Sequence, residues 1–307
     1  MVTEAAAKPV LAPRRRKGQR VSRGYRVFQV VNGVILTAVV VLTLVPFFNI
    51  VSISFSDEHH IRTGQVSFWP RGFNLVTYRR VMADPMFWTN YRNTVVYTVV
   101  ATVISIVLTI CYAYVLSKKH LRGRGALIAI AVFTMFFNGG LIPNYVLISG
   151  LGLRNTLWAI VLPNAINVFN LLVMKAFFES MPAELEEAAA VDGLNTYQTL
   201  LRIVLPLSKA VIATMVLFYA VSFWNSWFSA YLYMDRLELM PVTVYLRNLI
   251  AGSTGGSNQG EASDTALQIA ANIKAVTIVL TALPIMCIYP FIQRYFVRGV
   301  MLGAVKG

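Results

Sequence analysis

The chain has little charge and almost no cysteine. Of its 307 residues, 13% are Asp, Glu, Lys or Arg, and it has two cysteines and three histidines. Soluble globular proteins carry about 25% charged residues, so the composition excludes an ordinary soluble enzyme and a disordered chain. Two cysteines in apolar stretches, Cys111 and Cys287, exclude a disulfide framework and a zinc-binding spacing. We expect no metal site and no cofactor bound by this chain.

Apolar residues make up 57% of the chain and lie in long blocks. A helix rises about 1.5 Å per residue, so roughly 20 apolar residues cross a membrane core of ~30 Å. We therefore predict an all-α, polytopic membrane protein with six transmembrane helices. Six stretches of at least 19 residues contain no Asp, Glu, Lys or Arg: Val27–Ser56, Asn93–Ser117, Gly125–Leu153, Asn155–Met174, Ala210–Met234 and Ala275–Gln293.

The predicted spans also lack an energy source. No ionisable residue interrupts any of the six stretches, and proton- or ion-driven carriers usually keep one at membrane depth. The chain has no Gly-x-x-x-x-Gly-Lys-Ser/Thr loop with which to bind ATP. These absences indicate either a passive channel or a transport subunit that another protein drives.

The basic residues indicate the orientation in the membrane. Eight Lys and Arg residues precede the first stretch, and residues 118–124 hold four more. Because basic short loops stay on the cytoplasmic side, both termini are predicted to be cytoplasmic. We interpret most of the net charge of +14 as this topology signal and not as a nucleic-acid-binding surface. The predicted organisation is a basic cytoplasmic segment (1–26), a six-helix transmembrane domain (27–296) and a cytoplasmic tail (297–307).

The cytoplasmic segment between the fourth and fifth spans is acidic, against that trend. Its chemistry predicts a helix, a turn and a second helix, with Gly193 at the turn and Asn195 and Gln198 as a capping box. Two interpretations remain open: a helix that docks into a groove on a partner, or an interfacial helix that covers the bundle. The five acids are Glu179, Glu184, Glu186, Glu187 and Asp192.

One spacing in this segment resembles a known family. Glu187-Ala188-Ala189, three residues, Gly193, nine residues and Ile203-x-Leu205-Pro206 is similar to the EAA loop of permease subunits in ATP-binding cassette (ABC) importers. The tail 295–307 and the pair Asn93-Thr94 resemble the oligosaccharide permeases of the maltose type. The segment 136–143, Phe-Phe-Asn-Gly-Gly-Leu-Ile-Pro, resembles a subgroup for complex or polymer-derived oligosaccharides.

This resemblance implies a type I ABC importer permease fold and a chain that is not itself an enzyme. It also implies a bacterial plasma membrane, a dimer of ATP-binding subunits that carries ATP and Mg²⁺, and a second, different permease. An extracytoplasmic solute-binding protein would deliver a sugar or oligosaccharide to the outward segments 57–92 and 235–273. The loop 180–207 would couple to the ATP-binding subunit through Glu184, Glu187, Ala188, Ala189, Asp192, Gly193, Ile203, Leu205 and Pro206.

The substrate path is indicated less sharply. Sugars bind to aromatic faces and amides, but interfacial Trp and Tyr belts and simple packing are alternatives. The run Asn138-Gly139-Gly140 either breaks its helix, as binding sites in transporters do, or is a plain helix end. A permease for a non-sugar solute, a stand-alone channel and a secondary carrier also remain open. The path candidates are Asn138, Gly139, Tyr145, Trp224, Asn225 and Trp227.

Overall fold

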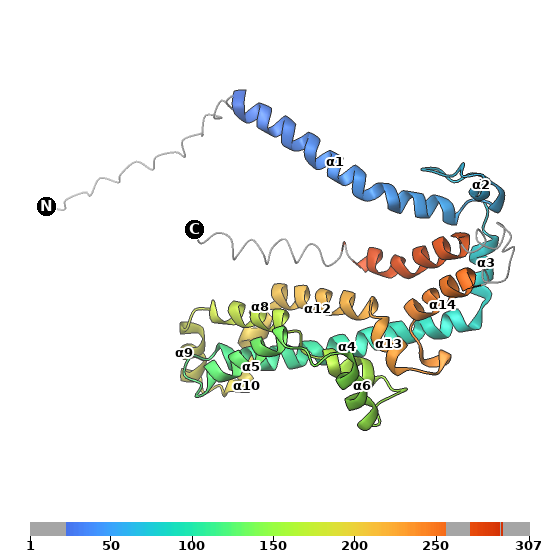
Figure 1. The fold of residues 1–307 in the computed structure, drawn as a ribbon. Helices are drawn as coiled ribbons and strands as arrows, with labels where there is room; N and C mark the ends of the chain where they lie inside the picture. The colour runs from blue at the N-terminus through green and yellow to red at the C-terminus, as the bar shows by residue number, and fades with distance from the viewer. Residues whose placement is uncertain (1–22, 256–270, 289, 291–307) are drawn as a thin grey trace. The chain divides into compact units, whose positions relative to one another are not determined.

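The computed structural model describes residues 23–255, 271–288 and 290, and within these ranges the chain is helical without a β-strand (Figure 1). The chain divides into two units, residues 1–48 and residues 49–307. Helix α1 (Arg23–Ser54) is a 32-residue apolar helix whose side chains up to residue 48 are almost all exposed. Apolar side chains exposed along a whole helix are suited to a lipid environment.

The second unit holds the remaining described helices. The first group is α2 (Glu58–Arg62), α3 (Val76–Ala83), α4 (Pro85–Ser117), α5 (Arg124–Phe136), α6 (Leu141–Gly150), α7 (Trp158–Val161), a 3₁₀ turn (Leu162–Asn164) and α8 (Val168–Glu179). The second group is α9 (Glu184–Val191), α10 (Thr196–Thr199), a π turn (Leu200–Val204), α11 (Leu205–Leu207), α12 (Lys209–Trp224), α13 (Phe228–Tyr233), a 3₁₀ turn (Leu237–Leu239), α14 (Val242–Gly255) and the helix Ala271–Ile288.

Three helices are long and apolar enough to cross a membrane, and three bent pairs supply the rest. The long helices are α1, α4 and Ala271–Ile288. The pairs are α5 with α6, bent by 113°, Trp158–Asn164 with α8, bent by 52°, and Thr196–Leu207 with α12, bent by 84°. With each bent pair counted as one span, the described residues contain up to six spans, as the charge-free stretches predict.

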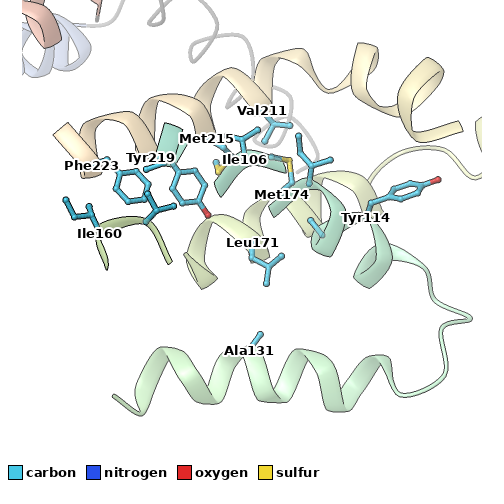
Figure 2. Packing of buried hydrophobic residues seen from close by; sticks show 14 of the residues in the cluster. Ile106, Tyr114, Ala131, Ile160, Leu171, Met174, Val211, Met215, Tyr219 and Phe223 are labelled. Carbon is cyan, nitrogen blue, oxygen red and sulfur yellow. The ribbon is translucent and has the colours of Figure 1, made fainter. Parts of the chain in front are cut away.

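Helix α4 lies at the centre of the bundle, packed along α8 and α12. Figure 2 shows the apolar side chains that fill the space between them, among them Leu171 and Met174 of α8 and Met215 of α12. All three are almost completely buried. Contacts of this kind hold the bundle together by close packing, since lipid chains are as apolar as the side chains themselves.

Ion pairs gather at the carboxyl end of α4. Lys118, directly after α4, pairs with Glu186 of α9. Arg124 pairs with Glu179, whose other oxygen accepts a 2.8 Å contact from Lys175. The basic loop 118–124 and the acidic segment after α8 are therefore on the same side of the bundle, as the topology prediction requires.

The amino end of α4 meets the segment after α13. Asn93 donates its amide to the carbonyl oxygen of Glu238 at 2.6 Å, and the Thr94 hydroxyl accepts the N–H of Val242 at 2.8 Å. Nearby, a single guanidinium nitrogen of Arg154, Nη2, donates to both carboxylate oxygens of Asp235 at 2.7–2.8 Å. The two sets of charged loops thus lie at opposite ends of α4.

The start of the second span differs from the sequence expectation. Helix α4 begins at Pro85 and not at Asn93, because Asp84 caps it by accepting the N–H of Met86 at 2.8 Å and proline suits the first turn. Asn93 and Thr94 are therefore buried inside the helix and not at its start. The charge-free stretch did not predict the start at Pro85, because Arg92 lies inside the helix and limits the stretch at that side. Residues 1–22, 289 and the tail 297–307 lie outside the described residues.

Candidate functional site

The segment 180–207 contains the predicted helix, turn and second helix. Helix α9 ends in a Schellman motif: the N–H of Leu194 donates to the carbonyl of Ala189 at 2.9 Å, and the N–H of Gly193 donates to Ala190 at 3.1 Å. Gly193 has φ +75°, the left-handed conformation that glycine adopts without strain. The capping box of Asn195 and Gln198 is present and begins α10.

One face of α9 is turned to solvent. Glu184, Glu187, Ala188 and Val191 lie at positions i, i+3, i+4 and i+7, which form one stripe on a helix. All four are exposed, and Val191 is exposed by 88%. We call these four residues the α9 stripe: its amino end is acidic and its carboxyl end is apolar.

Tyr197 and Leu201 extend the exposed apolar surface beyond α9. Tyr197 is exposed by 79% and Leu201 by 63%, on the helical turns that follow Gly193. Neither they nor Val191 were among the sequence candidates. The signal for Val191 was available, because it continues the helical spacing of Glu184, Glu187 and Ala188.

Ala189 lies on a different face of α9 from Ala188. It is only 1% exposed and lies on the inner face of α9, so its small side chain lets the helix approach its own bundle. Ala188 alone of the two alanines belongs to the α9 stripe. Ile203 and Leu205 are likewise partly buried, and Leu205 packs against the main apolar cluster, whereas Pro206 is exposed.

One ion pair at the end of α4, Lys118–Glu186, holds α9, and the others hold the end of α8 at Glu179. Lys118 also lies 4.0 Å from the centre of the Tyr114 ring, and Arg124 donates to the carbonyl of Leu116 at 2.7 Å. Two of the five acids in the segment, Glu179 and Glu186, are therefore engaged with the chain's own basic residues. Within the described residues, the other three, Glu184, Glu187 and Asp192, form no ion pair.

A sharp bend connects this segment to α12. The chain turns by 84° at Ser208, whose buried hydroxyl donates to the carbonyl of Val204 at 2.6 Å. Val204 is buried against the main cluster. Packed residues thus connect the segment 180–207 to α12, which runs along α4.

The second candidate region is the broken third span. The helix stops at Phe136, and Asn138 accepts the N–H of Gly140 at 2.8 Å in the turn that leads to α6. The 113° bend shows that Asn138-Gly139-Gly140 interrupts the span. A cavity of about 630 Å³ lies beside this break, lined by Asn138, Gly139 and Gly140 and by residues of α6, the 3₁₀ turn after α7, and α13.

The other path candidates do not line this cavity. Trp224 is buried, donates its indole N–H to the carbonyl of Thr281 at 3.0 Å and meets the Tyr91 ring edge-on, so it is a packing residue. Tyr145 stacks on Tyr233, and Asn225 donates to the carbonyl of Val221 at 2.9 Å.

Trp227 has a different partner, because it stacks under the guanidinium of Arg247 at 4.1 Å. Sequence reasoning missed four amides that line this cavity or a second one beside the 3₁₀ turn after α7: Asn144, Asn164, Asn167 and Asn170. They are isolated amides inside charge-free stretches, and only the fold shows which of them share a cavity.

The segment after α1 forms a small clamped loop. The Asp57 carboxylate accepts the N–H of His60 at 2.8 Å and contacts its ring at 2.6 Å, and Gly72 packs directly against it. These hydrogen bonds hold the pKa of Asp57 below its usual value. Phe55, Phe73 and Tyr78 stack beside the loop, and Trp69 is exposed.

Comparison with known proteins identifies the class. Residues 81–302 match the family of binding-protein-dependent transport system inner membrane components, which covers the centre of the bundle and the segment 180–207. The chain belongs to this family. It is a membrane-embedded permease subunit with the type I ABC importer fold.

Three similar proteins cover nearly the whole chain. Protein LplC of Bacillus subtilis is 40% identical over 92% of this chain and 96% of its own length. The polygalacturonan/rhamnogalacturonan transport system permease protein YtcP of the same organism is 38% identical over 87% and 93%. A chain in the crystal structure of a bacterial ABC transporter that imports the acidic polysaccharide alginate has a TM-score of 0.80 and 35% identity, over 90% of this chain and 98% of that one.

Proposed function

We propose that this chain forms the translocation path of an ATP-driven sugar or oligosaccharide importer and is driven by a separate ATP-binding subunit docked at α9. The exposed α9 stripe carries this proposal. A helix that is held to its own bundle by the Lys118–Glu186 ion pair and still presents unpaired carboxylates and apolar side chains is suited to contact a protein. ATP and Mg²⁺ are bound by the partner subunits.

The acidic part of the stripe supplies the electrostatic half of the contact. Glu184 and Glu187 have no partner among the described residues, so each can pair with a basic residue of the ATP-binding subunit. A pair that is partly desolvated in an interface contributes more than a surface pair, whose median is about 0–1 kcal/mol. Val191 and Tyr197 supply apolar area at the carboxyl end of the same surface.

Movement of the ATP-binding dimer then reaches the membrane as a rigid-body shift. The Schellman motif at Gly193 and the capping box at Asn195 fix the angle between α9 and α10. The buried Ser208 and Val204 fix the next turn into α12. Since α12 packs along α4, a shift of α9 changes how the two central helices meet.

A sugar substrate is supported by the relatives and by the chemistry of the path. Two of the similar proteins are named for transport of polygalacturonan and rhamnogalacturonan or of alginate. The broken third span places amide and aromatic side chains beside a cavity, and both are groups that bind sugars. A solute-binding protein would deliver the sugar at the end of α4 that holds Arg154 and Asp235, opposite the ATP-binding subunits. Both termini would be cytoplasmic, and a second permease would complete the path.

Co-purification tests the docking of the ATP-binding subunit. Glu187→Lys reverses a free charge in the centre of the α9 stripe, so we expect the purified permease pair to lose its ATP-binding subunit and its transport. Glu58→Lys is the matched control for retention of the ATP-binding subunit, because Glu58 is also an exposed acid in the first turn of a helix, but in the predicted outward segment 57–92. Wild-type ATPase binding and uptake in Glu187→Lys would contradict the docking assignment.

The same preparation separates the alternatives. Uptake that depends on ATP and on a sugar-loaded binding protein supports the importer. A stand-alone channel or secondary carrier would move solute with no ATP-binding subunit present. A permease for a non-sugar solute would retain the ATP-binding subunit but respond to no sugar-loaded binding protein.

A further inference from the structure

Two cavities in the membrane bundle share lining residues, and we call the two together the groove. The cavity of about 630 Å³ beside the broken third span and a second one of about 240 Å³ share Pro163 and Asn164 as lining residues. Both meet at the 3₁₀ turn that interrupts the fourth span. The groove therefore lies beside the breaks in two neighbouring spans, where helices in transporters expose polar groups to a substrate. Small-molecule sites have cavities of about 300–1,000 Å³.

The polar groups of the groove are neutral. The first cavity holds Asn138, Asn144, Asn164 and Ser229, and the second holds Asn164, Asn167, Asn170 and Ser222. Among the described residues that line the two cavities, none is Asp, Glu, Lys, Arg or His. Phe137 and Phe228 in the first cavity, and Phe169 and Phe218 in the second, add aromatic surface.

Asn170 shows that the second cavity is prepared for a polar ligand. Only 5% of its surface is exposed, yet its side-chain amide makes no hydrogen bond with the part of the chain that the structure describes. Its amide atoms are not among the fully enclosed unpaired polar atoms of the described residues, so they open to the cavity and are free to bond what enters it. Because Asn170 lines the cavity, a ligand there can supply the missing hydrogen bonds.

The wall behind this cavity is fixed by hydrogen bonds. The hydroxyl of Tyr219, a buried residue, lies 2.7 Å from the Thr109 hydroxyl and accepts the N–H of Asn167 at 3.0 Å. The Asn167 side chain in turn accepts the N–H of Asn170 at 3.1 Å and caps α8. Asn164, by contrast, makes no side-chain hydrogen bond within the described residues and is exposed to the groove.

We infer that this groove binds uncharged, hydroxyl-rich pyranose units, with Asn164 and Asn170 as specificity-determining residues; the inference rests on the proposed function. An amide both donates and accepts hydrogen bonds, as a sugar hydroxyl does, and aromatic rings pack on the apolar faces of a pyranose. A carboxylate in this groove meets no cationic side chain among the described lining residues, so it exchanges hydration for neutral groups without a compensating ion pair. The groove therefore selects neutral units over uronate units.

Binding of two matched disaccharides to the assembled importer tests this inference. Galactobiose and digalacturonate differ in the carboxylates of the uronate units. In nanodiscs without binding protein, we expect galactobiose to bind to the wild type and digalacturonate to bind at least tenfold more weakly, as followed by an NMR titration. Asn164→Leu and Asn170→Leu should each weaken galactobiose binding about tenfold, the effect of one lost hydrogen bond of the stronger kind.

Two further variants sharpen the test. Asn248→Leu changes an exposed amide of α14 that lines neither cavity and should bind galactobiose as the wild type does. Asn164→Lys places a cation in the groove and should raise digalacturonate binding at least tenfold.

Three results would overturn the inference: tight digalacturonate binding to the wild type, no binding of galactobiose, or unchanged binding in both leucine variants. Asn164 is exposed, so its variants test the groove even where Asn170→Leu fails to assemble. Retention of the ATP-binding subunit in the same samples is read separately. A failed groove with a retained ATP-binding subunit leaves the proposed function intact.

Discussion

Substitution of Gly193 tests how the coupling segment works. Gly193 has φ +75°, and a Cβ added there meets no atom within 4 Å. The whole effect of Gly193→Ala is therefore backbone strain, about 1–2 kcal/mol for an L-residue in this conformation. That strain shifts the equilibrium away from the native angle between α9 and α10 by a factor of about 5–30. Gly193→Asn costs less, because asparagine tolerates the left-handed region.

Gly193→Pro combines two losses. Proline fixes φ near −65° and has no N–H, so the bond from Gly193 to the carbonyl of Ala190 disappears with the turn itself. The assay is ATPase activity of the reconstituted importer on addition of loaded binding protein, together with the affinity for the ATP-binding subunit. We expect both quantities to fall in the order Gly, Asn, Ala, Pro.

Gly152 provides the matched control. It also has a positive φ, +67°, and open space around its Cβ direction, but it lies in the loop between the third and fourth predicted spans. Gly152→Ala should carry the same strain without weakening the contact to the ATP-binding subunit. Wild-type coupling in Gly193→Pro, or equal loss of the ATP-binding subunit in Gly152→Ala and Gly193→Ala, would refute the reasoning.

Three further predictions concern stability. Gly72→Ala should destabilise the loop after α1 far more than Gly64→Ala in thermal unfolding, since both have φ near +64° but only the Cβ at 72 collides with the Asp57 carboxylate; equal effects would show that the collision is relieved. Because the folded pKa of Asp57 is depressed, its stabilisation of the loop is present above the unfolded value near 3.8 and is lost as pH falls below that value. Proteolysis of the loop should therefore rise below about pH 4 in the wild type and at all pH values in Asp57→Asn. A flat wild-type profile would contradict this. Tyr219→Phe leaves the buried Thr109 hydroxyl without its partner and should cost about 1 kcal/mol of stability in a denaturant series. In the double variant, Thr109→Val should cause no further loss of stability.

Much of the architecture was predictable, because a lipid environment constrains a sequence strongly. A span of about 20 residues without charge has few alternatives to a helix, so six stretches predicted the six possible spans. The segment 180–207 was predictable for a local reason. The Schellman turn at Gly193 and the capping box at Asn195 depend on residues a few positions apart, and both are present in the structure.

Which residues face a partner and which face the bundle was decided by tertiary packing. Ala188 and Ala189 are adjacent and chemically identical, yet Ala188 is exposed and Ala189 is only 1% exposed. The reason is long-range, because α9 is held by the ion pair between its Glu186 and Lys118, which lies 68 residues earlier in the chain. Trp224 was a sugar-binding candidate by residue type, but its indole N–H, the only hydrogen-bond donor of the side chain, is bonded to the carbonyl of Thr281.

Sequence alone therefore determined the helical class and the number of possible spans, since these follow from local apolar content. The groove required the fold. Asn144, Asn164 and Asn170 belong to separate helices or turns, and each by itself is an unremarkable amide in an apolar stretch. They come to line one surface only because the third and fourth spans break at neighbouring points, and long-range packing against α12 and α13 sets that geometry.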